Sequence, residues 1–92
     1  MNMLYAVITK DKEGALQTRL DNRPAHVEYL KASAEVRMAG PFLNAEGTMH
    51  GSLIILECDT LDDAKSWAAD DPYAKAGLFA DVRIEAWNKV IG

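Results

Sequence analysis

Uninterrupted apolar runs alternate along the chain with stretches of helical spacing. Residues 3–9 are β-forming and contain no alternating polar positions, so they predict a strand that is buried on both faces. Residues 52–57 repeat this pattern and predict a second strand of the same kind. Two further strands are predicted at residues 36–42 and 82–91; in the latter, apolar and charged residues alternate.

Apolar residues spaced three and four apart predict helices between these strands. Residues 16–20 indicate a short helical turn, and residues 25–34 indicate a helix whose apolar stripe contains Val27 and Leu30. Pro24 has no backbone N–H, so it argues against one unbroken helix across this region. We therefore expect a turn followed by a separate helix.

A second helix is predicted after the third strand. Thr60 and Asp63 resemble a capping box in which Asp replaces Glu. Ala64, Trp67 and Ala68 then follow at helical spacing, as the buried stripe of a helix does.

The predicted order is β-α-β-β-α-β, which is the ferredoxin-like α+β arrangement, with residues 1–92 forming a single domain. Two helices cover only one face of a four-stranded antiparallel sheet. Because the first and third predicted strands are apolar on both sides, we expect a second copy of the chain to cover the other face. The pattern therefore predicts a homodimer with its sheets face to face.

Composition narrows the classes of partner. The formal net charge is −4, and the 10 basic residues are scattered singly, which argues against nucleic acid as a partner. The apolar run at residues 3–8 is too short for a secretory signal, and no segment is apolar enough to span a membrane. A single cysteine, Cys58, forms no internal disulfide, which agrees with a cytoplasmic location.

The sequence lacks the phosphate-binding glycine loops, paired cysteines and zinc-helix motifs of several large enzyme classes. His50, even together with Glu46, supplies too few ligands for a metal site. We therefore expect no cofactor and no metal, and a small-molecule ligand held by side chains alone.

His26 and Asp71 are the leading candidates for chemistry. His26 lies on the flank of an apolar helical stripe, near the ends of strands, where it is either a general base or a half-buried structural histidine. Asp71 directly precedes Pro72, so it is a good N-cap for a short helical turn that Gly77 closes. A carboxylate there is also able to hold a histidine N–H, and the sequence leaves both readings open.

Three further residues are candidates for substrate binding. Arg19 and Arg23 are four apart and face the same way if the turn is helical, so they either bind an anionic group or pair with carboxylates. Ser52 opens the third strand and either donates to a ligand or satisfies a loop carbonyl. We interpret Tyr73 and Phe79 as packing residues.

Several short segments together resemble the YciI-like (YCII-related) family across nearly the whole chain. They are Arg23-Pro-Ala-His26, Ala39-Gly-Pro41, Gly51-Ser52, Ala64-x-x-Trp67, Asp71-Pro-Tyr73 and Ala76-Gly77. The resemblance implies a ferredoxin-like fold that pairs into a dimeric α+β barrel. It also implies a catalytic pair made of His26 and Asp71, with Ser52 matching the serine after the strand-opening glycine.

Some relatives in this family are lyases that eliminate chloride from hydroxylated chloro-aromatic substrates with a His–Asp dyad. The resemblance thus implies a lyase- or isomerase-type reaction in which His26 is the general acid/base and Asp71 orients it. Arg19, Arg23 or Ser52 would anchor an oxygen-rich ligand. The alternatives are a non-catalytic dimeric domain that binds a metabolite, and a chain that serves only as an assembly partner.

Overall fold

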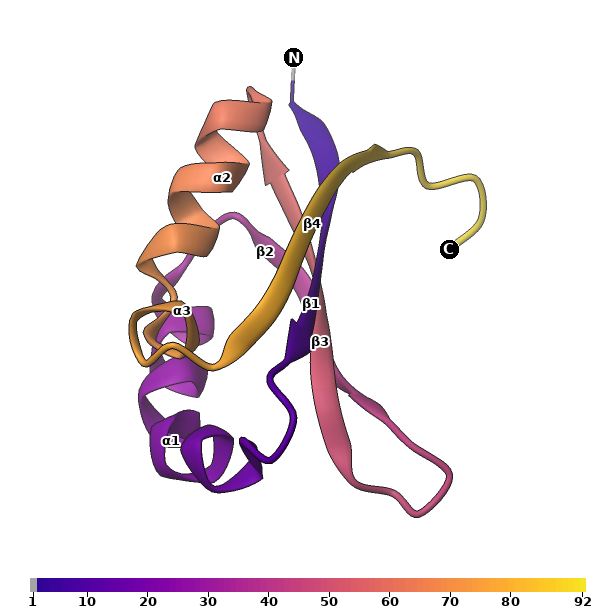
Figure 1. The fold of residues 1–92 in the computed structure, drawn as a ribbon. Helices are drawn as coiled ribbons and strands as arrows, with labels where there is room; N and C mark the ends of the chain where they lie inside the picture. Colours follow the sequence, from indigo (N-terminus) through magenta and orange to yellow (C-terminus); the bar gives the residue numbers. More distant parts are fainter. Residues whose placement is uncertain (1) are drawn as a thin grey trace.

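The computed structural model describes residues 2–92 as one antiparallel sheet with helices on one of its faces (Figure 1). The sheet has the strand order β2-β3-β1-β4, so β1 and β3 are central and β2 and β4 are edges. The elements follow the predicted β-α-β-β-α-β order, and the short helical turn predicted after Asp71 forms a third helix. The elements are β1 (Met3–Asp11), α1 (Leu16–Ala32), β2 (Val36–Leu43), β3 (Met49–Cys58), α2 (Leu61–Asp70), α3 (Pro72–Lys75) and β4 (Phe79–Trp87).

The hydrophobic core lies between the sheet and the helices. Tyr5 and Val7 of β1 pair directly with Leu56 and Ile54 of β3, so these four side chains share one face of the sheet. They pack against the predicted stripe of α2, formed by Ala64, Trp67 and Ala68. The two apolar runs of the sequence therefore form the centre of the sheet, as predicted.

The opposite face of the sheet carries no helix within residues 2–92, and all three helices lie together on the other side in Figure 1. Because successive residues of a strand point to opposite faces, Leu4, Ala6 and Ile8 of β1 belong to this open face. At the two edges it exposes Met38, at 54%, and Trp87, at 41%. The open face is thus apolar along β1, whereas β4 places the charged pair Arg83 and Glu85 beside Ile8 and Ala6 on the same face.

The helix α1 is continuous, and the prediction that Pro24 interrupts it is wrong. Pro24 lies inside a helix of 17 residues. The missing N–H of Pro24 leaves the carbonyl of Leu20 without its usual partner, but Leu20 lies on the exposed side of the helix, where water can hydrate that group. Arg19 before the proline and His26 after it are both buried, so tertiary contacts hold both halves in one helix.

Both predicted helix caps are present. The side chain of Thr60 accepts a hydrogen bond from the backbone N–H of Asp63 at 3.1 Å and so starts α2. The side chain of Asp71 accepts one from the backbone N–H of Tyr73 at 2.9 Å and starts α3. Gly77 follows with φ of 73°, a left-handed conformation that glycine adopts without strain.

Several strand ends differ from the prediction, most of all those of β3 and β4, and β4 begins at Phe79 where residue 82 was predicted. The strand β3 begins at Met49, because it pairs with β2 up to a tight turn at residues 44–48. The strand β4 ends at Trp87 and does not continue to Ile91. Trp87 pairs with Leu4, so almost none of β1 remains to pair with residues 88–92, which leave the sheet (Figure 1).

Candidate active site

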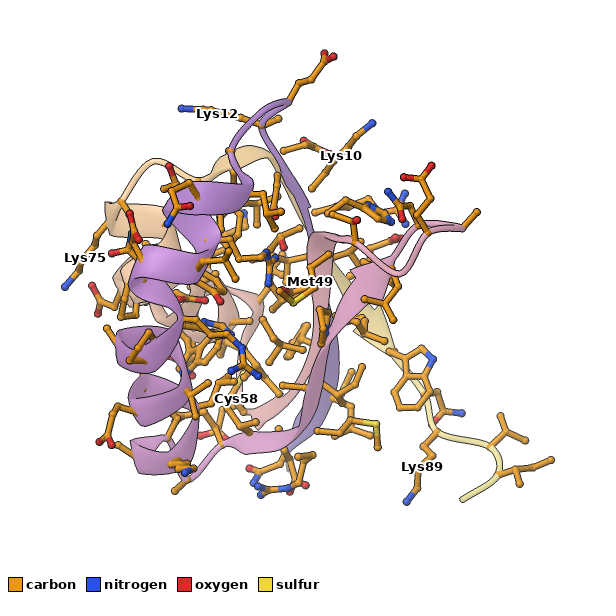
Figure 2. All side chains as sticks on the ribbon, turned by 90° about the horizontal axis from the view of Figure 1, so that it is seen from below. Lys10, Lys12, Met49, Cys58, Lys75 and Lys89 are labelled. Atoms are coloured by element: carbon orange, nitrogen blue, oxygen red, sulfur yellow. The ribbon has the colours of Figure 1, made fainter. Side chains whose placement is uncertain are left out.

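A small cavity of about 140 Å³ lies where α1, α3 and the strands β2 and β3 meet. Figure 2 shows Met49, one of the lining residues, between α1 and the sheet. Met49 and Cys58 are the first and last residues of β3. The apolar part of the wall comprises Val27, Leu30, Ala39, Gly40, Pro41 and Met49. The polar part comprises Arg19, Arg23, His26, Ser52 and Tyr73, so the sequence candidates other than Asp71 line the cavity itself.

His26 and Asp71 are in contact, although 45 residues separate them in the sequence. Nδ1 of His26 lies 2.8 Å from Oδ1 of Asp71, and the two residues are 6% and 1% exposed. The same Oδ1 accepts the backbone N–H of Tyr73 that starts α3. One carboxylate oxygen thus caps a helix and holds the imidazole, so the two readings of Asp71 are compatible.

This arrangement determines where His26 presents its second nitrogen. A carboxylate only accepts hydrogen bonds, so neutral His26 carries its proton on Nδ1 and has a lone pair on Nε2. Within residues 2–92, Nε2 has no protein partner, and no buried side-chain nitrogen or oxygen is left without one. Nε2 is therefore accessible from the cavity, as a general base must be.

Tyr73 packs directly on the imidazole. The ring centroids of His26 and Tyr73 lie 3.9 Å apart at an interplanar angle of 14°, and Tyr73 is only 1% exposed. Burial raises the pKa of the Tyr73 hydroxyl, and the charges of Arg19 and Arg23 only partly oppose that rise. Tyr73 is thus both a packing residue, as predicted, and a protonated hydroxyl in the wall of the cavity.

Arg19 is buried and largely committed to protein partners. Its Nε and Nη2 donate to the two carboxylate oxygens of Asp11 at 2.7 and 3.1 Å, and Nη2 also donates to Oγ of Ser52 at 2.9 Å. Nη1 takes no part in these contacts, and a hydrogen bond from Arg19 is among the effects that partly oppose the rise in the pKa of the Tyr73 hydroxyl upon burial. Arg19 therefore orders Ser52 and also contacts Tyr73 in the wall of the cavity.

Asp11 was not among the candidates from sequence, because the first strand was predicted only over residues 3–9. Asp11 is the last residue of β1 and is 9% exposed. The period-two pattern contained a usable signal, because residues 5, 7, 9 and 11 share the face that meets the helices. A carboxylate at the end of that row needs a buried partner, and Arg19 is the partner.

Ser52 is held in place by the sheet as well as by Arg19. Its backbone N–H donates to Oγ1 of Thr9 at 3.0 Å. The preceding Gly51 permits this approach, since a Cβ there would lie 2.3 Å from the carbonyl oxygen of Thr9. Because Oγ of Ser52 accepts from Arg19, its own proton is free to be donated into the cavity.

Arg23 differs from Arg19 in its surroundings. It is exposed at the mouth of the cavity, and no carboxylate of residues 2–92 forms an ion pair with it. The cavity thus has one neutralised, buried arginine and one exposed arginine whose charge is available to an anion.

The remaining candidates lie outside this cavity. His50 is exposed and stacks on Phe42 with centroids 6.1 Å apart. Burial raises the pKa of the Cys58 thiol, and nearby carboxylates raise it further. Cys58 is therefore not a reactive thiolate at neutral pH. Among the described residues, no three potential ligands gather as a metal site, and no helix is long and apolar enough to cross a membrane.

A second, larger cavity of about 610 Å³ opens at the far end of the helices. Its wall contains Cys58 and the stacked pair of Tyr29 and Trp67, whose centroids are 4.9 Å apart. It also contains a set of carboxylates: Glu35, Glu57, Asp59, Asp63 and Asp70. It has no histidine and no arginine, so proton transfer near neutral pH is better served by the smaller cavity.

Comparison with known sequences supports one family. A model of the YCII-related domain matches residues 3–88. Protein YciI of Escherichia coli is 33% identical, over 96% of this chain and 99% of that protein. An uncharacterized protein of Haemophilus influenzae is 37% identical over the same shares of the two chains.

Comparison with solved structures adds a relative of stated activity. The 5-chloro-2-hydroxyhydroquinone dehydrochlorinase of Burkholderia phenoliruptrix, solved in complex with 2,5-dihydroxybenzoquinone, is 39% identical with a TM-score of 0.86, over 94% of each chain. A Pseudomonas aeruginosa protein has a TM-score of 0.59 at 10% identity, over 98% of this chain and 95% of that one. The second likeness concerns the fold alone.

Proposed function

Because the chain belongs to the YCII-related domain family, we propose that it is a small-molecule enzyme in which His26 is the general acid/base. The reaction is an elimination or an isomerisation that begins with removal of a proton. One observation carries this proposal: Nδ1 of His26 is held by Asp71 while Nε2 is open to the cavity.

The proposed elimination conserves atoms and charge. Nε2 of His26 takes a proton from the substrate, and the released electron pair forms a new double bond as the leaving group departs as an anion. The Asp71 carboxylate stabilises the resulting imidazolium at Nδ1, and the imidazolium then returns its proton to solvent. General-base catalysis contributes roughly 10²–10⁴-fold, so ordered donors in the pocket must supply further stabilisation.

The substrate we propose is a compact, oxygen-rich ring. A volume of about 140 Å³ is well below the roughly 300–1,000 Å³ of sites for drug-sized ligands. The Burkholderia dehydrochlorinase acts on 5-chloro-2-hydroxyhydroquinone, a single ring of this kind. In this chain the hydroxyl of Ser52, the N–H groups of Arg19 and the unpaired charge of Arg23 would bind the ring oxygens.

Chloride release tests this proposal. The wild-type protein is incubated with 5-chloro-2-hydroxyhydroquinone, and free chloride is measured against time and against a protein-free control. We expect His26→Ala to lose at least a hundredfold in kcat/KM, in line with the loss of a general base. His50→Ala is the matched control, because it removes the exposed histidine outside the cavity. Equal rates for His26→Ala and the wild type would disprove the proposed role.

The alternative is a non-catalytic domain that binds a metabolite. The second hydrogen bond of Asp71 favours this alternative. Its Oδ1 also accepts the backbone N–H of Tyr73, and that contact stabilises the start of α3 without any part in catalysis. Tight ligand binding without turnover, unaffected by His26→Ala, would identify this alternative.

We also propose that the protein is a cytoplasmic homodimer. The open face of the sheet exposes Met38 and Trp87 alongside the apolar central strands. A second copy of the same surface buries this face by symmetry. The homodimer needs no further protein to form, and the only other partner we propose is the small-molecule ligand.

A further inference from the structure

The segment Asp71-Pro72-Tyr73 contributes two groups to His26, not one. Oδ1 of Asp71 accepts the imidazole N–H, and the Tyr73 ring lies flat against the imidazole at 3.9 Å. The Asp71 oxygen also accepts the backbone N–H of Tyr73, so the carboxylate and the aromatic ring are fixed relative to each other. The helix cap thus aligns both partners of the histidine at once.

The stacking has a geometric consequence for Nε2. The hydrogen bond at Nδ1 restrains the imidazole at one nitrogen only, which leaves small rotations about the Cβ–Cγ bond of His26. The near-parallel Tyr73 ring, at an angle of 14°, removes these rotations. Phe79 in turn packs edge-on against Tyr73, with centroids 6.2 Å apart at 84°, and holds that ring in place.

The hydroxyl of Tyr73 has a separate role. Tyr73 lines the cavity, and its hydroxyl donates no hydrogen bond to another group of residues 2–92. Arg19 lies beside Tyr73, with its guanidinium carbon 4.7 Å from the ring centroid. Burial raises the pKa of the hydroxyl, and a hydrogen bond from Arg19 partly opposes that rise without removing the hydroxyl proton. A guanidinium has no acceptor atom, so it cannot receive the hydroxyl proton. That proton remains available to a ligand.

We propose that Tyr73 is a substrate-contacting residue of this site, whose hydroxyl donates a hydrogen bond to a ring oxygen of the substrate while its ring holds His26 in plane. The inference rests on the proposed function. As Nε2 removes a proton, negative charge grows on an oxygen of the conjugated ring, and a positioned donor stabilises that charge. The raised pKa of Tyr73 supports this role, since the group keeps its proton at neutral pH.

Two substitutions separate the hydroxyl from the ring. Tyr73→Phe removes the donor and keeps the stacked ring, so the fold and the His26 plane are retained. Tyr73→Leu removes both. Tyr29→Phe is the matched control, because its hydroxyl donates to the carbonyl of Trp67 and lies in the other cavity.

The probe is 2,5-dihydroxybenzoquinone, with affinity measured by titration calorimetry and the His26 ring nitrogens observed by ¹⁵N NMR. We expect Tyr73→Phe to weaken binding about tenfold, the size expected for a lost hydrogen bond to a charged oxygen, with unchanged His26 nitrogen shifts. Tyr73→Leu should weaken binding further and alter those shifts. Tyr29→Phe should bind like the wild type.

Failure of this inference is distinguishable from failure of the proposed function. If the wild type binds the quinone and releases chloride in a His26-dependent way, but Tyr73→Phe equals it in both, only the role of the Tyr73 hydroxyl is overturned. If the wild type neither binds the quinone nor releases chloride, both are overturned. A tenfold loss of binding in Tyr73→Phe, with a larger loss in Tyr73→Leu and none in Tyr29→Phe, supports the role of the Tyr73 hydroxyl, and chloride release that depends on His26 supports the proposed function.

Discussion

The guanidinium of Arg19 and the carboxylate of Asp11 form a buried ion pair with two hydrogen bonds, at 2.7 and 3.1 Å. The pair joins the end of β1 to the first turns of α1, and through Ser52 it reaches β3. Its side chains are 3% and 6% exposed, so neither charge can turn to water if the other is removed. The polar wall of the cavity depends on this contact.

Replacing Asp11 should therefore destabilise the protein strongly. Asp11→Ala leaves the Arg19 charge buried without a partner, and such losses amount to about 3–5 kcal/mol in the free energy of unfolding. Urea denaturation checks this value. The control is Glu57→Gln, which breaks the exposed pair between Glu57 and Arg37 and should change the unfolding free energy far less. Similar losses in the two variants would contradict the buried pairing.

Substitutions at Asp71 should separate catalysis from stability. An asparagine at this position retains an oxygen that accepts from both the Tyr73 N–H and His26 Nδ1–H, but it no longer carries a charge to stabilise the imidazolium. We expect Asp71→Asn to lower the chloride-release rate at least tenfold with a small change in melting temperature.

Asp71→Ala provides the comparison, because it removes both hydrogen bonds. The two unpaired donors should lower stability by roughly 1–3 kcal/mol, or at least several degrees in melting temperature for a domain of this size. If Asp71→Asn melts as low as Asp71→Ala while its rate stays normal, the pair is structural and the binding alternative gains support.

Tyr29 should make the protein sensitive to alkali. Burial raises the pKa of Tyr29 from 10.0 to about 12, with smaller contributions from the negative charges of Asp70, Asp71 and Glu35. The folded state thus keeps a proton that the unfolded state loses above pH 10, so this stabilisation is complete below pH 10 and disappears as pH rises through about 12. Unfolding free energies measured from pH 9 to 12 should fall more steeply for the wild type than for Tyr29→Phe. Parallel curves would refute the shift.

A charge on the open face of the sheet should dissociate the proposed dimer. Met38 lies beside Ile55 on that face and is 54% exposed, so Met38→Glu is tolerated by the folded chain but not by an apolar contact between copies. We expect a dimer for the wild type and a monomer for Met38→Glu in sedimentation velocity. Leu61→Glu, at an apolar position 39% exposed on the helical side, should remain dimeric. A monomeric wild type would refute the dimer.

Local patterns in the sequence were sufficient to predict most of the fold. The uninterrupted apolar runs predicted the two central strands, since only a central strand covered on both faces needs them. Thr60 and Asp71 predicted two helix starts, because a cap bonds to a backbone N–H only two or three residues away. The resemblance, and not the spacing, brought His26 and Asp71 together before the structure was known.

Other features were decided by contacts between distant segments. The helix α1 runs through Pro24 because buried residues on both sides hold it, and β4 stops at Trp87 because its partner strand ends there. Arg19 was a candidate from sequence, but its partner Asp11 and the stacking of Tyr73 on His26 emerge only when β1, α1 and α3 converge. The sequence by itself determined which segments form strands and helices and which residues can carry protons. Only the tertiary structure decided which of those residues meet, because burial and pairing depend on neighbours that the chain brings from far away.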